Sequence, residues 1–324
     1  MNLPRRKFFR FAVSVAALPA MSRIARAQAY PTHPIRFIVP YPPGGATDAA
    51  ARVVGEFLSR SLGQQIVVEN KSGGGSLIGV ESAAASAPDG YTVLVTTDIV
   101  TSAPHTFKMR IDPLRALIPV VQLSRQPVVL AVHPSLGIST LAEFVALAKQ
   151  QPGMSFATSG IGTQQHVTAE WFASLAGIKL AHVPYRGGAP ALNDLIAGHV
   201  KIGSLGSTPL IPHHKAGTLR LLAQSTEKRS PTLPDVPTYQ EAGINGLVLD
   251  QWVGVFLPAG TPPGVAARLN TEINKALAES AVRDGFLQSG QEPVGGSAEA
   301  FSRLVRGDFD TYARLVKELN IKSD

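Results

Sequence analysis

The sequence predicts an α/β protein with two lobes joined by two crossover segments. The chain has 324 residues, of which 44% are hydrophobic and 16% charged, so it is long enough for two folded domains. From Ile35 onward, short β-branched runs alternate with segments of helical periodicity, which is typical of parallel sheets with crossover helices. The 30 glycines and 25 prolines indicate many tight turns between short elements.

The residue composition excludes several kinds of chemistry. Because the chain contains no Cys, it has no disulfides, thiolate zinc sites, cysteine nucleophiles or iron–sulfur clusters. Binding or catalysis therefore depends on oxygen atoms, nitrogen atoms and the backbone.

Residues 1–27 have the three parts of a secretory signal peptide. A basic region ends at Arg10, residues 11–20 are apolar, and the segment closes on the small-residue pattern Ala-Arg-Ala. We expect cleavage after Ala27, or after Ala29 as a second choice. The apolar run is shorter than the roughly 20 residues that span a bilayer, so we expect an exported, periplasmic protein without a permanent anchor.

Two export routes are compatible with this signal. The Arg5-Arg6 pair, followed by Lys-Phe-Phe, resembles the twin-arginine export motif. Pro4 stands where Ser or Thr is usual, so the general secretory route stays open.

The positive charge of the chain is concentrated in this N-terminal segment. The whole chain has 30 Lys and Arg against 23 Asp and Glu, but six of the basic residues and none of the acidic ones lie in residues 1–27. Without the segment, 24 basic residues face 23 acidic ones. A nearly neutral mature chain does not favour a nucleic-acid partner.

The first lobe begins with a predicted strand at residues 35–41, which ends in a Pro-Pro-Gly-Gly turn. Apolar residues between positions 53 and 62 recur at helical spacing, with Thr47 or Asp48 as the expected N-cap and Gly63 as the terminator. The remaining elements expected in this lobe are a strand at 65–70, a Gly-rich turn at 72–76, a helix at 78–86 and a strand at 92–96.

A second series of alternating elements follows the extended segment 128–132. Thr140 and Glu143 form a capping box ahead of an amphipathic helix that ends near Gln151. The later elements expected in this lobe are strands at 155–158, 180–184, 201–205 and 220–224 and helices at 163–176 and 191–197.

The chain then returns to the first lobe. A strand at 252–257 precedes helical patterns at 265–279 and 298–320 that have no sheet of their own, so we expect them to cover the first sheet. Two crossings form a hinge, and a cleft between such lobes can close on a ligand. The predicted domains are 28–127 with 255–324 as lobe 1 and 128–254 as lobe 2, with crossings near 125–132 and 250–257.

The loop at residues 40–48 contains the largest set of candidate ligand-binding groups. It combines an aromatic residue, a rigid turn, two glycines and the start of a helix at the end of a strand. Backbone amides of residues 45–47 can hold a carboxylate, as helix N-termini do. Asp48 then either caps the helix or accepts a donor from a ligand.

Six motifs together resemble the extracytoplasmic solute receptors of the tripartite tricarboxylate transporter family, often called Bug or TctC-like proteins. The resemblance runs from about Tyr30 to the end of the chain. It implies two Rossmann-like α/β lobes of the periplasmic binding protein type, the Venus flytrap architecture. The motifs are residues 40–48, Asn70 to Gly75, Pro88 to Thr92, Thr158 to Thr163, Val183 to Gly188 and Leu257 to Pro262.

The same resemblance implies the function and the site. It describes a receptor, not an enzyme, that has no cofactor or metal, closes on a small organic carboxylate and delivers it to the membrane subunits of the transporter. Relatives carry Asp or Asn near the turn at residues 206–208; this chain has neither, so the resemblance offers no partner for an amino or amide group at this edge. Carried over by position, the ligand-binding residues are Tyr41, Gly44, Gly45, Ala46, Thr47, Asp48, Thr97 and Asp98 in the first lobe and Ser159, Gly162, Thr163, His166, Tyr185, Arg186, Gly187 and Ser207 in the second.

Two residues keep alternative roles at this point. His166 lies in the first turn of its predicted helix and either donates to a carboxylate or serves only structure. Trp252, at the return crossing, either packs in the hinge or stacks on a ligand.

Other functions were weighed against the transport receptor. A ligand sensor for a two-component kinase is the nearest alternative. A secreted hydrolase is disfavoured because the chain has no G-x-S-x-G elbow. A metal site at the pair His213-His214 is disfavoured because no third ligand stands near it in the sequence. A dinucleotide-binding enzyme is also disfavoured, because the spacing of Gly73, Gly75 and Gly79 differs by one residue from the dinucleotide-binding fingerprint.

Overall fold

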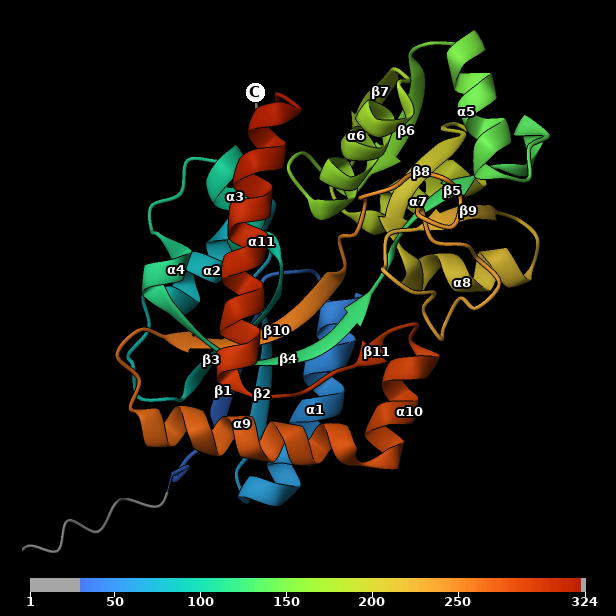
Figure 1. Ribbon diagram of the computed structural model, residues 1–324. Coiled ribbons are helices and arrows are strands. Elements are labelled where there is room, and N and C mark those ends of the chain that lie inside the picture. Colours follow the sequence, from blue (N-terminus) through green and yellow to red (C-terminus); the bar gives the residue numbers. More distant parts are fainter. Residues whose placement is uncertain (1–29, 322–324) are drawn as a thin grey trace, which may run out of the picture.

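The computed structural model describes residues 30–321 and consists of two α/β lobes, each built on its own β-sheet (Figure 1). The predicted signal peptide lies outside the described residues. Among the residues described, none of the helices combines the length and apolarity needed to cross a membrane.

The first lobe contains a six-stranded mixed sheet in the order β11-β4-β10-β3-β1-β2. Strands β2, β1 and β3 are parallel, whereas β10 is antiparallel to both β3 and β4. The parallel pairing expected from the alternating elements is present in β2, β1 and β3, and the return strand β10 adds antiparallel pairs that the alternation does not predict. The strands are β1 (Ile35–Val39), β2 (Ile66–Asn70), β3 (Thr92–Thr97), β4 (Leu117–Gln126), β10 (Gln251–Pro258) and β11 (Glu292–Pro293).

Both faces of this sheet are buried, since successive residues of a strand point to opposite sides. Phe37 and Val39 of β1 join the cluster that includes α1 and α9, while Ile38 joins the one that includes α2, α3 and α11. The late helices therefore cover the first sheet, as expected. The helices are α1 (Ala46–Leu62), α2 (Leu77–Ala84), α3 (Ile99–Thr106), α4 (Pro113–Ala116), α9 (Pro263–Ala278), α10 (Ser280–Gln288) and α11 (Ala298–Glu318), with a 3₁₀ turn η1 (Gly74–Ser76).

The second lobe contains a five-stranded sheet in the order β7-β6-β8-β5-β9. Strand β6 is parallel to β7 and β8, and β5 is antiparallel to β8 and β9. The predicted capping box of Thr140 and Glu143 is confirmed at the start of α5. The elements are β5 (Val128–Val132), β6 (Met154–Thr158), β7 (Leu180–Pro184), β8 (Ile202–Gly206), β9 (Arg220–Gln224), the turn η2 (Pro134–Leu136), and α5 (Leu141–Gln150), α6 (Gln164–Ala176), α7 (Gly188–Ile196) and α8 (Ser207–Lys215).

The chain crosses between the lobes at two adjacent places. On the outward path β4 leads through Pro127 directly into β5, and on the return path the chain enters β10 at Gln251. Strand β10 pairs with β4 from its first residue. Residues 251–254, which the sequence assigned to lobe 2, therefore lie in the sheet of the first lobe.

The lobes also touch through α11, which extends along the first lobe to reach α6 of the second (Figure 1). Val167 of α6 and Leu249 pack in one buried cluster with Tyr312, Leu315 and Val316 of α11. We call this cluster, together with Ile321, the interlobe cluster. It buries apolar surface from both lobes on one side of the molecule.

Candidate functional site

The predicted site residues lie on loops that follow parallel strands, or in the first turn of the next helix. The loops follow β1 and β3 in the first lobe and β6, β7 and β8 in the second. This is the edge at which open α/β sheets bind ligands, because helix N-termini present free N–H groups there.

The start of α1 offers an unoccupied set of backbone donors. Gly45 is the N-cap, in an extended conformation with φ −81° and ψ 171°, so the helix begins at Ala46 and not after Thr47 or Asp48 as predicted. Within the described chain, the N–H groups of Gly45, Ala46 and Thr47 donate to no protein acceptor. Gly44 and Gly45 are exposed, and a Cβ on Gly45 would find only the carbonyl of Pro42, at 3.9 Å. An anion can therefore approach these amides closely.

Asp48 organises this loop from the inside. Its side chain is buried and accepts hydrogen bonds from Arg52 at 2.9 and 3.0 Å, from the Asn70 amide at 3.0 Å and from the Gly44 N–H at 2.9 Å. Burial opposes ionisation, but hydrogen bonds from Arg52, Gly44 and Asn70 outweigh it and hold the pKa of Asp48 below its usual value. Since both carboxylate oxygens already have two donors, Asp48 positions the loop rather than offering an oxygen to a ligand.

Replacing Asp48 with Ala should lower the free energy of unfolding by about 1 to 3 kcal/mol, because the buried donors around it lose their acceptor. Urea denaturation of D48A measures the change. D284A, which removes an exposed carboxylate of α10, serves as the control and should stay within about 0.5 kcal/mol of the parent protein. Equal stability of D48A and D284A would contradict the structural role.

Tyr41 and Thr97 join the loops after β1 and β3, since their hydroxyl groups hydrogen-bond to each other. Asp98, the next residue, is instead directed into the lobe: it is only 2% exposed and accepts a 2.7 Å hydrogen bond from Tyr312 of α11. Burial, reinforced by the nearby charge of Asp308, raises the pKa of Asp98 to about 7 in spite of the Tyr312 hydrogen bond.

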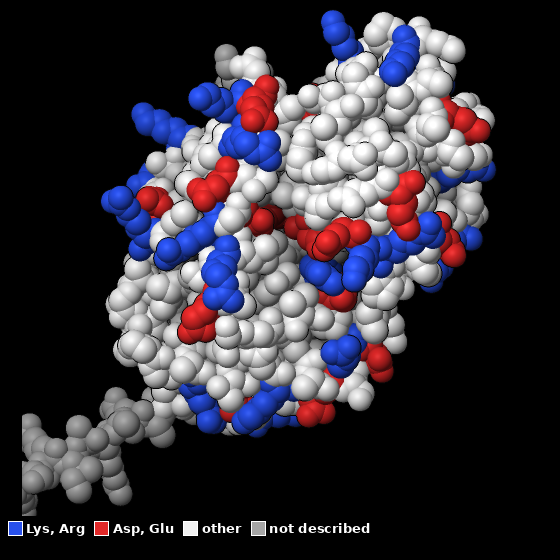
Figure 2. Space-filling view, in the orientation of Figure 1, with Lys and Arg blue, Asp and Glu red and all other residues white. Residues whose placement is uncertain are grey.

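The acidic residues continue along the junction of the lobes, where Figure 2 shows red side chains gathered between the two halves. Asp308 of α11 accepts a 2.6 Å hydrogen bond from the indole of Trp252, which is buried. Burial raises the pKa of Asp308 to about 6, with a further contribution from Asp250. Of the two roles considered for Trp252, the structure shows hinge packing.

The loop after β6 is held by its own side chains. The Thr163 hydroxyl donates to the Gly160 carbonyl at 2.8 Å and accepts from the His166 N–H, capping α6. His166 accepts from the Gly162 N–H at Nδ1, at 3.1 Å, and stacks on His182 with ring centroids 3.7 Å apart. His166 is only 6% exposed, and these contacts hold it within the loop.

Gly162 brings this loop against the first lobe. It has a φ of +70°, and a Cβ there would collide with the side chain of Thr106 in α3. Ser159 is partly exposed beside it, and its N–H donates to Gln165 at 3.0 Å. The two lobes therefore approach each other closely along the edge where the predicted residues lie.

The loop after β7 presents an exposed cation, Arg186. Tyr185 donates to Asp194 at 2.6 Å, which ties its ring to α7, and the Gly187 N–H donates to the Ser159 carbonyl at 3.1 Å. Arg186 is exposed and has no hydrogen-bond or ion-pair partner among the described residues. It stands at the start of α7, where free helix N–H groups add to its positive field.

Ser207 connects the start of α8 to the first lobe. It is fully buried, its hydroxyl lies 3.4 Å from the Gly290 carbonyl, and its N–H donates to Pro127 at 3.0 Å. Gln291, the residue after Gly290, donates from its side-chain amide to the Ala46 carbonyl at 3.1 Å. The turn at residues 290–291 therefore bridges the starts of α1 and α8, which places Ser207 in the interlobe framework.

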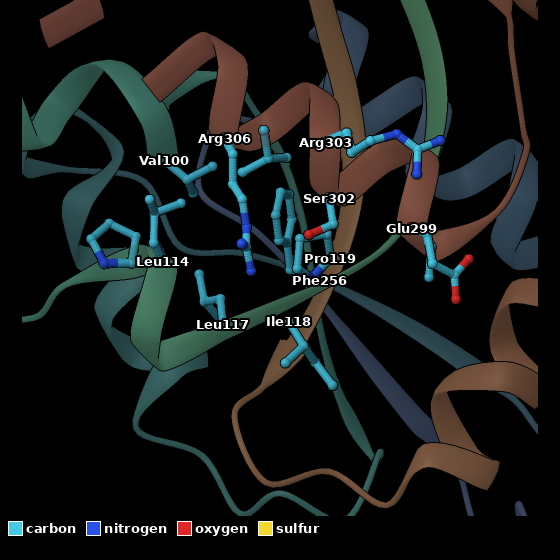
Figure 3. Close-up of a pocket in the computed structure, with 13 residues that line it drawn as sticks. Val100, Leu114, Leu117, Ile118, Pro119, Phe256, Glu299, Ser302, Arg303 and Arg306 are labelled. Carbon is cyan, nitrogen blue, oxygen red and sulfur yellow. The ribbon is translucent and has the colours of Figure 1, made fainter. Parts of the chain in front are cut away.

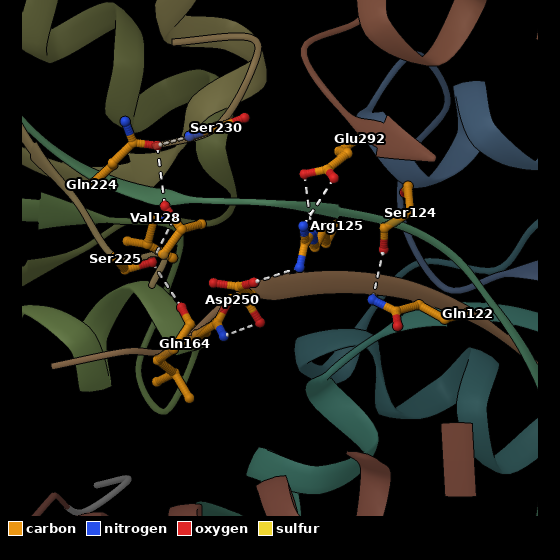
Figure 4. Close-up of polar contacts among 12 residues, drawn as sticks. Gln122, Ser124, Arg125, Val128, Gln164, Gln224, Ser225, Ser230, Asp250 and Glu292 are labelled. Atoms are coloured by element: carbon orange, nitrogen blue, oxygen red, sulfur yellow. Dashed lines mark hydrogen bonds and ion pairs between the residues drawn. The ribbon is translucent and has the colours of Figure 1, made fainter. Parts of the chain in front are cut away.

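Sequence reasoning missed the polar network that supports the crossings (Figure 4). Arg125 of β4 forms two hydrogen bonds with Glu292, at 2.8 and 3.0 Å, and lies 3.8 Å from Asp250. Gln164, at the start of α6, donates to the Asp250 carbonyl at 2.7 Å. These partners are 86 to 167 positions apart, and no local motif in the sequence marks them.

Among the described residues, no three His, Asp or Glu side chains lie close enough together to hold a metal ion. His213 and His214 lie in the last turn of α8, and His213 pairs with Thr218 at 3.2 Å.

The two lobes, the double crossing and the free helix N-termini at the interlobe edge define a periplasmic binding protein fold. Two solved structures of this fold match the chain closely: the binding protein BugD, with a TM-score of 0.82 and 30% identity, and an R. palustris protein solved with adipate, with a TM-score of 0.85 and 32% identity. Each comparison covers 91% of this chain and 100% of the other.

The sequence comparisons identify the family. The model of the tripartite tricarboxylate transporter family receptor matches residues 50–321. The Bordetella pertussis protein BugT is 36% identical over 303 residues, which are 91% of this chain and 92% of BugT. A protein from the tcbD-tcbE intergenic region of Pseudomonas sp. strain P51 is 36% identical over 326 residues, covering 100% of this chain and 97% of the relative. The chain belongs to the tripartite tricarboxylate transporter receptor family.

Proposed function

We propose that this protein is a periplasmic receptor that captures a small organic carboxylate between its lobes and delivers it to the membrane subunits of a tripartite tricarboxylate-type transporter. It binds its ligand without making or breaking covalent bonds. The observation that carries the proposal is the exposed start of α1, where three successive N–H groups have no acceptor among residues 30–321. Two solved relatives support it: one contains adipate, and MatC from Rhodopseudomonas palustris contains malate.

The predicted residues divide into two groups in this proposal. Those with free donors or exposed side chains contact the ligand, and those already hydrogen-bonded inside the protein hold the loops in place. The proposed ligand contacts are Gly45, Ala46, Thr47, Ser159 and Arg186, and the positioning residues are Tyr41, Gly44, Asp48, Thr97, Asp98, Gly162, Thr163, His166, Tyr185, Gly187 and Ser207.

Calorimetry tests the proposal on the protein without residues 1–27. The panel contains malate, adipate, benzoate and acetate, each paired with its amide, which keeps the shape but removes the charge. At least one acid is expected to bind at least about a hundredfold more tightly than its amide, because charge-assisted hydrogen bonds at the amides of α1 are lost. A panel in which no acid binds would contradict the receptor assignment.

Replacing Arg186 with Gln should weaken binding of the acid found in this panel by about tenfold, because one charge-assisted contact is removed. Lys149→Gln makes the same charge change at an exposed position of α5 and should leave the Kd unchanged. Equal affinities of R186Q and K149Q would exclude Arg186 from the ligand contacts.

A further inference from the structure

A cavity lies in the first lobe, away from the interlobe edge. It has a volume of about 510 Å³, is open to solvent on one side and is lined by residues of α3, α4, β4, β10 and α11 (Figure 3). None of the sixteen predicted ligand residues lines it. Its volume lies within the range of small-molecule sites, about 300 to 1,000 Å³.

The inner wall of this cavity is apolar. Val100, Leu117, Phe256 and Val305 line it, and each is at most 3% exposed. Leu114 of α4 closes one rim and is 36% exposed, a high fraction for a leucine beside a buried wall. The cavity therefore offers an apolar ligand segment contacts that water does not provide.

An exposed cation, Arg306, lies beside this apolar wall. In Figure 3 the side chain of Arg306 extends from α11 between Val100 and Phe256, and its guanidinium ends near Leu117. Among the described residues, Arg306 has neither a hydrogen-bond nor an ion-pair partner. A guanidinium presents five N–H donors that match a carboxylate in a two-point contact.

Arg303, one turn earlier on α11, provides a natural comparison. Its guanidinium points away from Leu117 and Phe256 in Figure 3. Like Arg306, it has no hydrogen-bond or ion-pair partner among the described residues. The two arginines line the same cavity but differ in the direction of their side chains.

We propose that this cavity is a second binding site, which takes an amphipathic monocarboxylate. The carboxylate pairs with Arg306, and an alkyl or aromatic tail lies against Val100, Leu117 and Phe256. The site is separate from the interlobe site, so both can be occupied at once.

Octanoate is the probe, and octanol is its uncharged counterpart. Binding is measured by calorimetry on the protein without residues 1–27 in a Gly45→Val background, which removes the proposed interlobe site. The further variants in this background are R306Q, the matched control R303Q, and S302F, which fills the cavity from α11. Methyl NMR of the Gly45→Val protein locates the probe through the signals of Leu117 and Val305.

The expected result is saturable octanoate binding that R303Q leaves unchanged, R306Q weakens by about tenfold and S302F abolishes. Octanol should bind at least about tenfold more weakly than octanoate. No octanoate binding, equal loss in R303Q and R306Q, or methyl shifts that spare Leu117 and Val305 would each overturn the proposal. Because Gly45→Val is present throughout, failure here leaves the interlobe receptor function untouched.

Discussion

Gly45→Val is expected to weaken binding of the carboxylate ligand by at least about a hundredfold, because a β-branched side chain would stand beside the free amides of α1 and block two charge-assisted hydrogen bonds. The change introduces no backbone strain, since the φ of −81° and ψ of 171° at Gly45 suit any residue. A Cβ there has no contact closer than 3.9 Å. The N-cap preference for Gly over Val costs at most about 1 kcal/mol of stability.

Calorimetry of G45V against the acid identified in the panel measures this loss, and urea denaturation confirms that the fold is retained. Gly264→Val is the matched control, because Gly264 also lies at the start of a helix, α9, with no atom within 4 Å of a Cβ. G264V should bind as the parent protein does. A Kd for G45V within threefold of that for G264V would remove this loop from the site.

The second large effect concerns pH. The folded protein is expected to lose stability as pH rises from about 4 to about 7, because Asp98 keeps its proton in the folded state up to a pKa of about 7 but loses it near its ordinary pKa of 3.8 when unfolded. Within that window the folded state binds more protons than the unfolded state, so each increase in pH favours unfolding. Asp308 and Asp250, whose pKa values burial raises to about 6, act in the same direction.

Urea denaturation at pH 5 and pH 8 measures this dependence. Asp98→Asn keeps an acceptor for Tyr312 but cannot ionise, so it should reduce the loss of stability between the two pH values by about 1 to 4 kcal/mol. Asp310→Asn, an exposed position on α11, should leave the loss unchanged. If D98N loses as much stability as D310N over this interval, Asp98 is not the group responsible.

Much of the fold was predictable because its signals are local. The turn after β1, the helix terminator Gly63 in the left-handed conformation and the capping box at Thr140 each depend on residues within one turn of each other. Strand direction is not local: β10 pairs with β4 residues more than 120 positions away. Helix α3 was missed because its sequence, IVTSAPHT, lacks an apolar helical period and contains Pro104.

The same difference between local signals and long-range contacts applies to the candidate site. Sequence analysis identified the loops, because glycines and helix starts mark them, but the partners of Asp48 and Asp98 could not be predicted. Asn70 and Tyr312 lie 22 and 214 positions from these two acids, and only the folded chain brings them together. Whether an acid faces a ligand or the interior depends on such distant partners.

The interlobe cluster has a consequence for affinity. Because it joins α6 of one lobe to α11 of the other, the halves cannot part on that side without exposing Val167 and Leu315 to water, at a cost of about 25 cal/mol for each Å² uncovered. The cluster therefore favours the arrangement in which the two lobes meet on this side. If the proposed receptor binds its ligand in that arrangement, the measured Kd is the intrinsic constant divided by the fraction of molecules in it, so polar substitutions at Val167 are expected to weaken binding of every ligand by one common factor.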